Sequence, residues 1–345
     1  MSSEPIVTVV LTTFNQAKWL KESIDSVVAQ TFRDWELLIV DNGSVDETPL
    51  VVAAYAGDAR IRSIRYERNT AHTFICNAAV GQARGRYISF LYGDDYYLPR
   101  KLERQLDAFE TLTPKHGVVY CGGYVRPASG RLEEAPCAAA EGDVLEALLT
   151  RAPAKLFLPI APMARRECLL RYPFNERLFM EGEAVFGKIA LGYWFAPVPE
   201  LLHVMRDHET NRGKEISANL ERNVLMLDEL FDHPDFPDRL RHRRKALMAK
   251  TYRLAGWQAI RRERNYAVGR ERLRAAVAHD PALRGDLRVR TGLMLSRLPA
   301  WMANACQRAI DGWNGTPPPV EGVDSMPVSG IQPGAGNRPS SLGTP

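Results

Sequence analysis

The sequence predicts an α/β fold in which helices flank a twisted, mostly parallel sheet. Three short apolar runs rich in β-branched residues, at 6–11, 35–40 and 61–66, are typical of buried strands. A helical pattern follows each run after a short polar turn. Strand, turn and helix repeated at this spacing indicate βαβ units, and such units build parallel sheets.

The elements can be placed in order along the first hundred residues. After the first strand, a helix is predicted from apolar residues at helical spacing, namely Trp19, Leu20, Ile24, Val27 and Val28. The second strand stops at the turn sequence 41–44, and a second helix opens at about residue 45. The third strand leads to a helix over 73–83, and a fourth strand, 87–91, ends in a Gly-Asp-Asp turn.

Polar residues follow three of these strands at the point where each strand ends. Thr13 follows the first strand, Asp41 the second, and Asp94 and Asp95 the fourth. Because ligands of parallel sheets bind at the carboxyl ends of strands, we expect these side chains to share a site. Adjacent carboxylates suit a cation such as Mg²⁺, which takes its other ligands from phosphate oxygens and water. The alternative is that these aspartates only cap a helix or close an Asx turn.

Four segments together resemble the inverting family 2 glycosyltransferases, which use the A-type nucleotide-sugar-binding fold. They are 9–15, 30–32, 36–44 and 90–99, in the order of that family. Farther along, 192–200 resembles the last core strand of the family, and 206–211 resembles its closing Arg-x-His segment. The resemblance covers roughly residues 5–212.

For the donor substrate, the resemblance implies a nucleotide diphosphate sugar. Asp41 would accept hydrogen bonds from the nucleotide base, and Asp94 would contact the ribose or a metal-bound water. The implied nucleotide-sugar-binding residues are Thr13, Phe14, Asn15, Asp41, Asn69 and Asp94.

The resemblance also implies a Mg²⁺ or Mn²⁺ ion that bridges the diphosphate. Asp95 would ligate the ion, and His208 would be a later ligand or a contact to the diphosphate. The ion would offset the charge that develops on the leaving diphosphate. A lone histidine is also common as a structural residue, so both interpretations of His208 stay open.

An inverting transfer needs a base that takes the proton of the acceptor hydroxyl. The family supplies it from a Glu-Asp pair at the start of a late helix. Counting back from Gly192, that aspartate corresponds to Glu181, and Glu183 lies two residues farther on. Glu181 is therefore the predicted base and Glu183 the second candidate. Acids in the first turn of a helix also favour the helix dipole without any catalytic role.

The chain departs from the family pattern at positions that bear on the site. Tyr92 stands in place of the first acid of the Asp-x-Asp-Asp turn, and Asn42 in place of a second acid after the second strand. Thr12 replaces a frequent proline, and Cys76 replaces an expected arginine. Two other functions are therefore weighed: a catalytically impaired relative that only binds nucleotide sugar, and a nucleotidyltransferase. The latter usually has a glycine-rich loop after its first strand, and 12–15 contains no glycine.

Composition favours a folded, cytoplasmic protein. The 345 residues carry a net charge of +4, and the five cysteines lack a Cys-x-x-Cys spacing, so neither a disulfide framework nor a zinc site is indicated. The N-terminus lacks the basic and apolar regions of a signal peptide. No apolar run is long enough to span a bilayer.

The C-terminal part is strongly basic. From Asp238 to Pro299 it has fifteen Arg and two Lys against five acids, so the rest of the chain carries a net charge of −8. Leu247, Trp257 and Ile260 interleave with this charge at helical spacing, which predicts amphipathic helices. Three interpretations stay open: a helical bundle with a solvated charged face, attachment to an anionic membrane on its inner, cytoplasmic side, and binding of nucleic acid.

The expected organisation is a glycosyltransferase catalytic domain at 1–214, an Arg-rich helical region at 215–312 and a tail at 313–345. Residues 315–345 contain seven Pro, six Gly and four Ser, so the tail is predicted to be disordered. The expected role is the assembly of a bacterial surface polysaccharide or glycolipid, with a glycan or lipid-linked acceptor.

Overall fold

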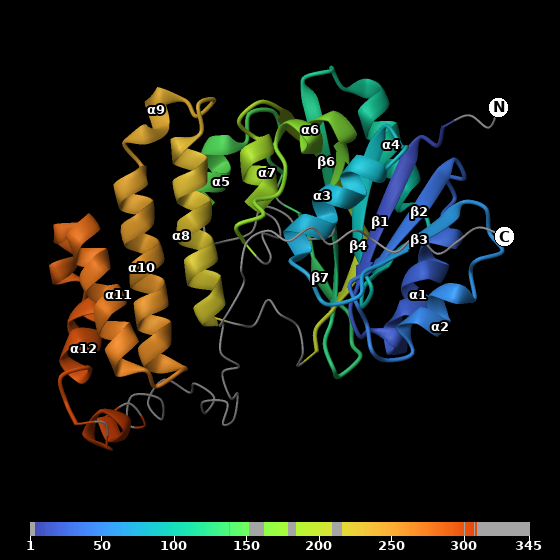
Figure 1. The fold of residues 1–345 in the computed structure, drawn as a ribbon. Coiled ribbons are helices and arrows are strands. Elements are labelled where there is room, and N and C mark those ends of the chain that lie inside the picture. The colour runs from blue at the N-terminus through green and yellow to red at the C-terminus, as the bar shows by residue number, and fades with distance from the viewer. Residues whose placement is uncertain are drawn as a thin grey trace. The chain divides into compact units, whose positions relative to one another are not determined.

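The chain forms two compact units that divide near residue 211. The computed structural model describes residues 4–137, 139–151, 162–178, 184–208, 216–299, 301–306 and 308. The described part of the N-terminal unit contains a sheet with helices, and that of the C-terminal unit is helical (Figure 1). The predicted tail at 313–345 lies outside the described residues.

The N-terminal unit is built on a nine-stranded sheet. Its strands are β1 (Val7–Thr13), β2 (Trp35–Asp41), β3 (Ile61–Arg65), β4 (Tyr87–Tyr92), β5 (Tyr96–Tyr97), β6 (His116–Arg126), β7 (Glu133–Ala135), β8 (Met163–Arg165) and β9 (Trp194–Arg206). Their order is β3-β2-β1-β4-β8-β6-β9-β5, and β7 pairs with β6. The pairs among β1, β2, β3 and β4 are parallel, as is β6 with β9, whereas β5, β7 and β8 pair antiparallel. The prediction of a mostly parallel sheet is confirmed.

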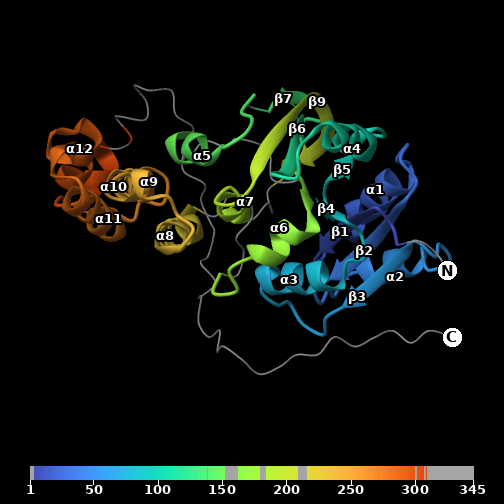
Figure 2. The same ribbon diagram turned by 90° about the horizontal axis from the view of Figure 1, so that it is seen from above.

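Helices cover both faces of this sheet (Figure 2). One face carries α1 (Ala17–Val28), α2 (Thr48–Ala53) and α4 (Lys101–Thr111). The other carries α3 (His72–Gln82), α6 (Arg166–Arg171) and α7 (Ala184–Ile189), and α5 (Leu145–Arg151) follows β7 in the chain. Because both faces are covered, every residue of β1 and β2 is buried, as their continuous apolar runs predict.

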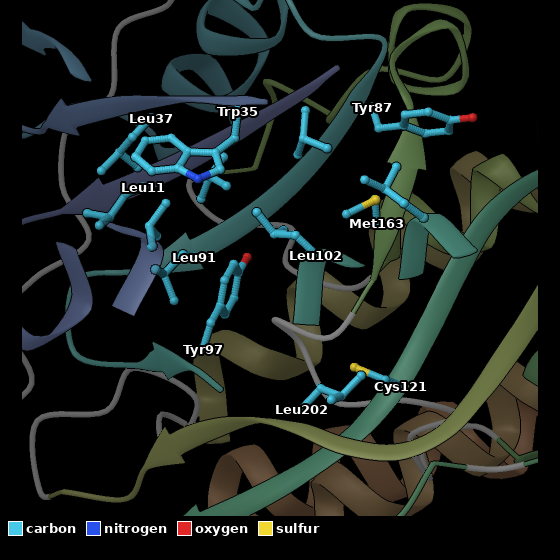
Figure 3. Close-up of a cluster of buried hydrophobic side chains, with 14 of the residues drawn as sticks. Leu11, Trp35, Leu37, Tyr87, Leu91, Tyr97, Leu102, Cys121, Met163 and Leu202 are labelled. Carbon is cyan, nitrogen blue, oxygen red and sulfur yellow. The ribbon is translucent and has the colours of Figure 1, made fainter. Parts of the chain in front are cut away.

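The main hydrophobic core lies between the sheet and the α1, α2 and α4 layer. Leu11, Leu37 and Leu91 extend into it from three neighbouring strands, and Leu102 of α4 packs against them (Figure 3). Alternate residues of a strand point to opposite faces, so one set of strand side chains supplies this core and the other faces α3. The core fixes α1 and α4 beside the acidic turn that follows β4.

The C-terminal unit is a helical bundle. Its elements are α8 (Ile216–Asp232), α9 (Asp238–Arg241), α10 (Arg244–Arg261), α11 (Tyr266–His279), the 3₁₀ helix Pro281–Gly285 and α12 (Leu287–Leu295). Ile260, Leu273 and Val289 form its core. A Cβ on Gly269 would lie 2.4 Å from Ile260, so this glycine lets α10 and α11 approach closely. Among the described helices, none combines the length and apolar character needed to cross a bilayer.

Candidate functional site

The carboxyl ends of three strands meet at one edge of the sheet. Thr13 at the end of β1 is paired in register with Asp41 at the end of β2, and Thr12 is paired with Tyr92 of β4. The backbone N–H of Gly93 donates to the carbonyl of Thr12 at 3.0 Å, which carries this register into the acidic turn. The polar residues that follow these strands therefore lie at one edge, as the sequence predicts.

Asp41 is a buried carboxylate with one oxygen that has no hydrogen-bond donor in the described part of the chain. Its Oδ1 accepts the backbone N–H of Ser44 at 2.9 Å. Its Oδ2 lies 3.4 Å from Nε of Arg65, without the geometry of a hydrogen bond. A buried acceptor without a donor costs free energy, so a ligand N–H is a fitting partner for this atom.

Three asparagines connect the loops around Asp41. Asn15, at a positive φ of 53°, donates its backbone N–H to Oγ of Ser44 at 2.9 Å and accepts the N–H of Val45 at 2.8 Å. Asn42 donates its amide to Oδ1 of Asn69 at 2.9 Å. Asn15 and Asn69, both predicted to bind nucleotide sugar, thus shape the loops, and Asn42 is a structural residue that sequence reasoning missed.

Thr13 and Phe14 close the turn between β1 and α1. Thr13 is buried and donates from Oγ1 to Oε1 of Gln16 at 3.2 Å, and the N–H of Phe14 reaches the same oxygen at 3.4 Å. A Cβ on Gly93 would lie 2.6 Å from Oγ1 of Thr13. Only glycine therefore fits at 93 without displacing the end of β1.

The two aspartates of the turn have different partners. Oδ2 of Asp94 lies 3.0 Å from Nε2 of His208, and Oδ1 of Asp95 accepts the backbone N–H of Arg206 at 2.8 Å. Burial, and then the charge of Asp94, raise the pKa of Asp95 well above its ordinary value. His208 therefore adjoins Asp94, whereas the sequence grouped it with Asp95. Of the two acids, Asp94 is thus the one in contact with the histidine.

The segment that carries His208 is held by α1. Trp19 stacks on the imidazole of His208, with ring centroids 4.3 Å apart and an interplanar angle of 23°. The guanidinium of Arg206 donates to the carbonyl of Asp94 and to the carboxylate of Glu22. Trp19 was predicted on the core face of the helix, but it is only half-buried and contacts the site instead.

A polar stripe on α1 also binds the acidic turn and the residues after it. Ser23 and Ser26 lie three positions apart on one side of the helix, and Gln30 follows just after its C-terminal end. The hydrogen bonds are from Ser23 Oγ to the carbonyls of Gly93 (2.9 Å) and Asp95 (2.5 Å), from Tyr97 N–H to Ser26 Oγ (3.1 Å), and from Gln30 Nε2 to the carbonyl of Leu98 (2.9 Å). This stripe fixes where the two aspartates can point.

Three of the departures from the family pattern are neighbours in space. Oγ1 of Thr12 lies 3.1 Å from Nε2 of His72, and Sγ of Cys76 lies 3.6 Å from the same ring. The ring centroid of Tyr92 lies 5.7 Å from that of His72. These residues are scattered along the sequence, so no sequence pattern indicates that they form one cluster around His72.

The predicted catalytic residues Glu181 and Glu183 lie outside the described residues. Within the ranges that the structure describes, no three His, Cys, Asp or Glu side chains are arranged to hold a metal ion together. Asp94 and His208 form a close pair, and Asp95 follows Asp94 in the chain.

A surface hollow of about 460 Å³ lies at the opposite edge of the sheet, where β1 and β4 begin. The arginines that line it are Arg84, Arg86, Arg165 and Arg166. Arg84 pairs with Glu36 at 2.6 Å, and Arg165 donates to the carbonyl of His116 at 2.9 Å. Both arginines therefore connect loops and strands of the sheet, and this structural role accounts for their presence at the hollow.

Comparison with known proteins assigns the N-terminal part to a family. The model of glycosyl transferase family 2 matches residues 8–141. This part of the chain is similar to that family. The chain is 36% identical over 118 residues to the uncharacterized glycosyltransferase RP339 of Rickettsia prowazekii (strain Madrid E), covering 34% of this chain and 36% of RP339. TuaG of Bacillus subtilis (strain 168), named for teichuronic acid biosynthesis, is 34% identical over 105 residues, covering 30% of this chain and 42% of TuaG. The chain thus spans well under half of each relative's length.

Solved structures agree with this chain in fold. Residues 1–349 of S. aureus TarS, in complex with UDP-GlcNAc, give a TM-score of 0.55 at 18% identity and cover 84% of this chain and 91% of that chain. The mannosyltransferase PcManGT of Pyrobaculum calidifontis, in complex with GDP-Man and Mn²⁺, gives 0.55 at 18% identity and covers 91% and 84%. The expected A-type glycosyltransferase fold is confirmed.

Proposed function

We propose that this chain is an enzyme that transfers a sugar from a nucleotide diphosphate sugar to a hydroxyl group, with inversion at the anomeric carbon. The observation that carries the proposal is the edge where β1, β2 and β4 end. There, Asp41 has a buried oxygen without a described donor, and the acidic turn offers the carboxylate of Asp94. The match of residues 8–141 to glycosyl transferase family 2 and the nucleotide sugars bound in TarS and PcManGT support this proposal.

On the donor side, the proposed roles follow from the geometry of the loops. Asp41 accepts an N–H of the nucleotide base through Oδ2, while Ser44 holds its other oxygen. Thr13 and Phe14 form the floor of the same pocket through the turn that Gln16 closes. Asp94 contacts the ribose or a water in the diphosphate region.

The acidic turn fits a divalent cation. The carboxylate of Asp94 offers an oxygen ligand and the imidazole of His208 a nitrogen ligand, and these two atoms lie 3.0 Å apart. The carboxylate of Asp95 comes next in the chain. A small number of protein ligands is enough for Mg²⁺ or Mn²⁺, because these ions complete their coordination with phosphate oxygens and water. A bound cation supplies positive charge that offsets the charge on the departing diphosphate. The Mn²⁺ complex of PcManGT supports this assignment.

On the acceptor side, Glu181 is the proposed base, and Glu183 is the second candidate. Removal of the hydroxyl proton during attack requires a carboxylate or imidazole on the acceptor face. The proposed acceptor is a glycan or a lipid-linked glycan in the assembly of a bacterial surface polysaccharide. The name of TuaG supports this setting.

The test is incubation of the whole chain with Mn²⁺, a panel of UDP-, GDP- and dTDP-sugars, and candidate hydroxyl acceptors. We expect that one nucleotide sugar of the panel supports release of nucleoside diphosphate. NMR of the glycoside product should show that the configuration at the anomeric carbon is inverted. Donor binding by calorimetry without release of diphosphate would instead identify an impaired relative. Release of pyrophosphate would identify a nucleotidyltransferase.

A further inference from the structure

The end of the C-terminal bundle exposes large apolar side chains. Of the nine large hydrophobic residues that are exposed in the described chain, four lie between 287 and 302, so they are concentrated in one short segment. They are Leu287 (76% exposed), Met294 (57%), Trp301 (72%) and Met302 (37%). Leu287 and Met294 are seven residues apart on α12, and therefore lie on the same side of that helix. The opposite side, with Val289 and Leu295, is buried in the bundle.

The same segment is basic and contains no acid. From Leu287 to Arg308 the sequence has four arginines and neither Asp nor Glu. Arg288, Arg290 and Arg297 are exposed, and none of the three forms an ion pair with a described residue. Other arginines of the bundle do form ion pairs, as Arg244 does with Asp228 at 2.5 Å and Arg253 with Asp286 at 3.2 Å. The exposed apolar residues thus lie among cations that no described protein group neutralises.

We propose that this basic apolar end, formed by residues 287–302, docks on an anionic lipid surface. Leu287, Met294 and Trp301 enter the interfacial region, and the flanking arginines contact lipid phosphates. Leu247 and Ile260 of α10 do not take part, because both are buried. The docking surface is therefore narrower than the basic stretch from Asp238 to Pro299 that indicated lipid binding in the sequence.

Lipid fits this end better than the other partners that a basic surface can have. Pairing of two copies through the same patch would place arginines of one copy against arginines of the other. Nucleic acid would engage the arginines and could stack on Trp301, but it offers exposed Leu287 and Met294 no apolar partner. An anionic bilayer surface provides both the negative charge and the apolar layer.

The test is flotation of the whole chain with vesicles of phosphatidylcholine alone and of an equal mixture with phosphatidylglycerol. The chain should float with the mixed vesicles and much less with phosphatidylcholine, and added salt should weaken the binding. The double variant Leu287→Ser, Trp301→Ser should bind the mixed vesicles at least about tenfold more weakly, since two apolar side chains no longer enter the lipid. The control Leu50→Ser, at a position on α2 that is 72% exposed, should bind like the wild type.

A second variant keeps the test independent of the apolar substitutions. Arg288→Glu, Arg290→Glu should also reduce binding, whereas Arg131→Glu on the N-terminal unit should not. Absence of flotation with either vesicle, or equal flotation of wild type and double variant, overturns the proposal. A wild-type dimer in light scattering that the double variant loses would overturn it in favour of a second copy. Turnover of a water-soluble donor should be unchanged in every variant, so this test stands apart from the proposed activity.

Discussion

At the scale of single residues, the acidic turn after β4 is the feature on which the proposed activity depends. Asp94 lies at the rim against His208, and Asp95 points inward to the backbone of Arg206. One acid thus meets the histidine that the family pattern assigns to the metal, and the other anchors the strand that carries it. For Asp95, a substitution that keeps shape and removes charge separates its hydrogen bond to Arg206 from its proposed role at the cation.

We expect Asp95→Asn to lower kcat/KM for the nucleotide sugar by about 100-fold or more, because the cation site loses a negative charge. The amide oxygen can still accept the N–H of Arg206, so the melting temperature should change by only a few degrees. Release of nucleoside diphosphate and thermal melting measure the two effects. Asp107→Asn, on an exposed part of α4, is the control. Unchanged turnover in Asp95→Asn would remove Asp95 from the metal assignment.

A second substitution tests the proposed base. Glu181→Gln should reduce kcat by about 10²–10⁴-fold while sparing donor affinity, since a general base acts on the acceptor hydroxyl. Steady-state kinetics and donor calorimetry measure the two quantities, and Glu183→Gln is the matched control. A loss of kcat that appears only in Glu183→Gln would transfer the role to that residue.

The cluster around His72 gives a third prediction at this scale. Cys76 is fully buried and contacts the His72 ring, so the arginine that the family carries there has no space in this chain. Cys76→Arg should lower the free energy of unfolding by more than about 2 kcal/mol, through overpacking and a buried charge. Urea unfolding measures the change, and Cys306→Arg at an exposed position is the control. Wild-type stability of Cys76→Arg would show that the site accommodates the family residue after all.

At the scale of elements, α1 positions the acidic turn and the closing segment together. Its buried residues Leu20, Ile24 and Val27 attach it to the core, and its polar side binds the turn. Trp19 stacks on His208 at the start of the same helix. Because one rigid helix contacts both segments, a change on α1 should alter the site without touching a ligand.

Ser23 is the residue through which this can be tested. Ser23→Ala removes the hydroxyl between the carbonyls of Gly93 and Asp95, which should lower the free energy of unfolding by about 1 kcal/mol. Displacement of the turn should also reduce kcat/KM for the donor by about tenfold or more. Ser63→Ala, at an exposed position on β3, should change neither quantity. A normal kcat/KM in Ser23→Ala would show that the turn keeps its geometry without α1.

At the scale of the whole molecule, a buried cation links stability to pH. Lys101 is fully buried, and its Nζ lies 2.9 Å from Oγ of Ser89, 2.8 Å from Oε1 of Gln105 and 4.1 Å from the centre of the Tyr97 ring. Burial lowers the pKa of Lys101 from 10.5 to about 8, against the opposing effect of Cys121. None of these partners is a carboxylate, so the charge of Lys101 is stabilised by two polar side chains and an aromatic ring.

The pKa of Lys101 sets the direction of the pH effect. Between about pH 8 and pH 10.5 the unfolded chain keeps the lysine proton that the folded chain has lost, so stability should rise with pH in this window. Burial also raises the pKa of Cys121 from 9.0 to about 12, which opposes this trend above about pH 9. His203, whose pKa burial lowers to about 3, stays neutral throughout.

A comparison with Lys101→Met isolates the lysine from Cys121, which both proteins contain. From pH 7 to about pH 9.5, the wild type should gain about 2 kcal/mol of stability relative to the variant. Urea unfolding at a series of pH values measures this difference. Parallel pH profiles for the two proteins would show that Lys101 titrates normally.

Local patterns in the sequence determined most of the parallel half of the fold. The strands and helices up to Tyr92 were predicted to within two or three residues, because apolar runs and turn residues report on neighbours in the chain. The gathering of Thr13, Asp41 and the acidic turn at one edge followed from the parallel arrangement alone. In contrast, β5, β7 and β8 are only two or three residues long, too short for any periodicity to mark them.

Contacts between distant residues were decided only by the tertiary structure. The sequence shows that Asp94, Asp95 and His208 are present, but side-chain direction in the turn and the path of β9 decide that Asp94 faces the histidine. Likewise, the packing of α1 on the turn places Trp19 against His208, whereas the sequence predicted it in the core. Composition in the sequence thus fixes which chemistry the chain carries. Register and packing, which join residues far apart in the chain, fix which groups can act together.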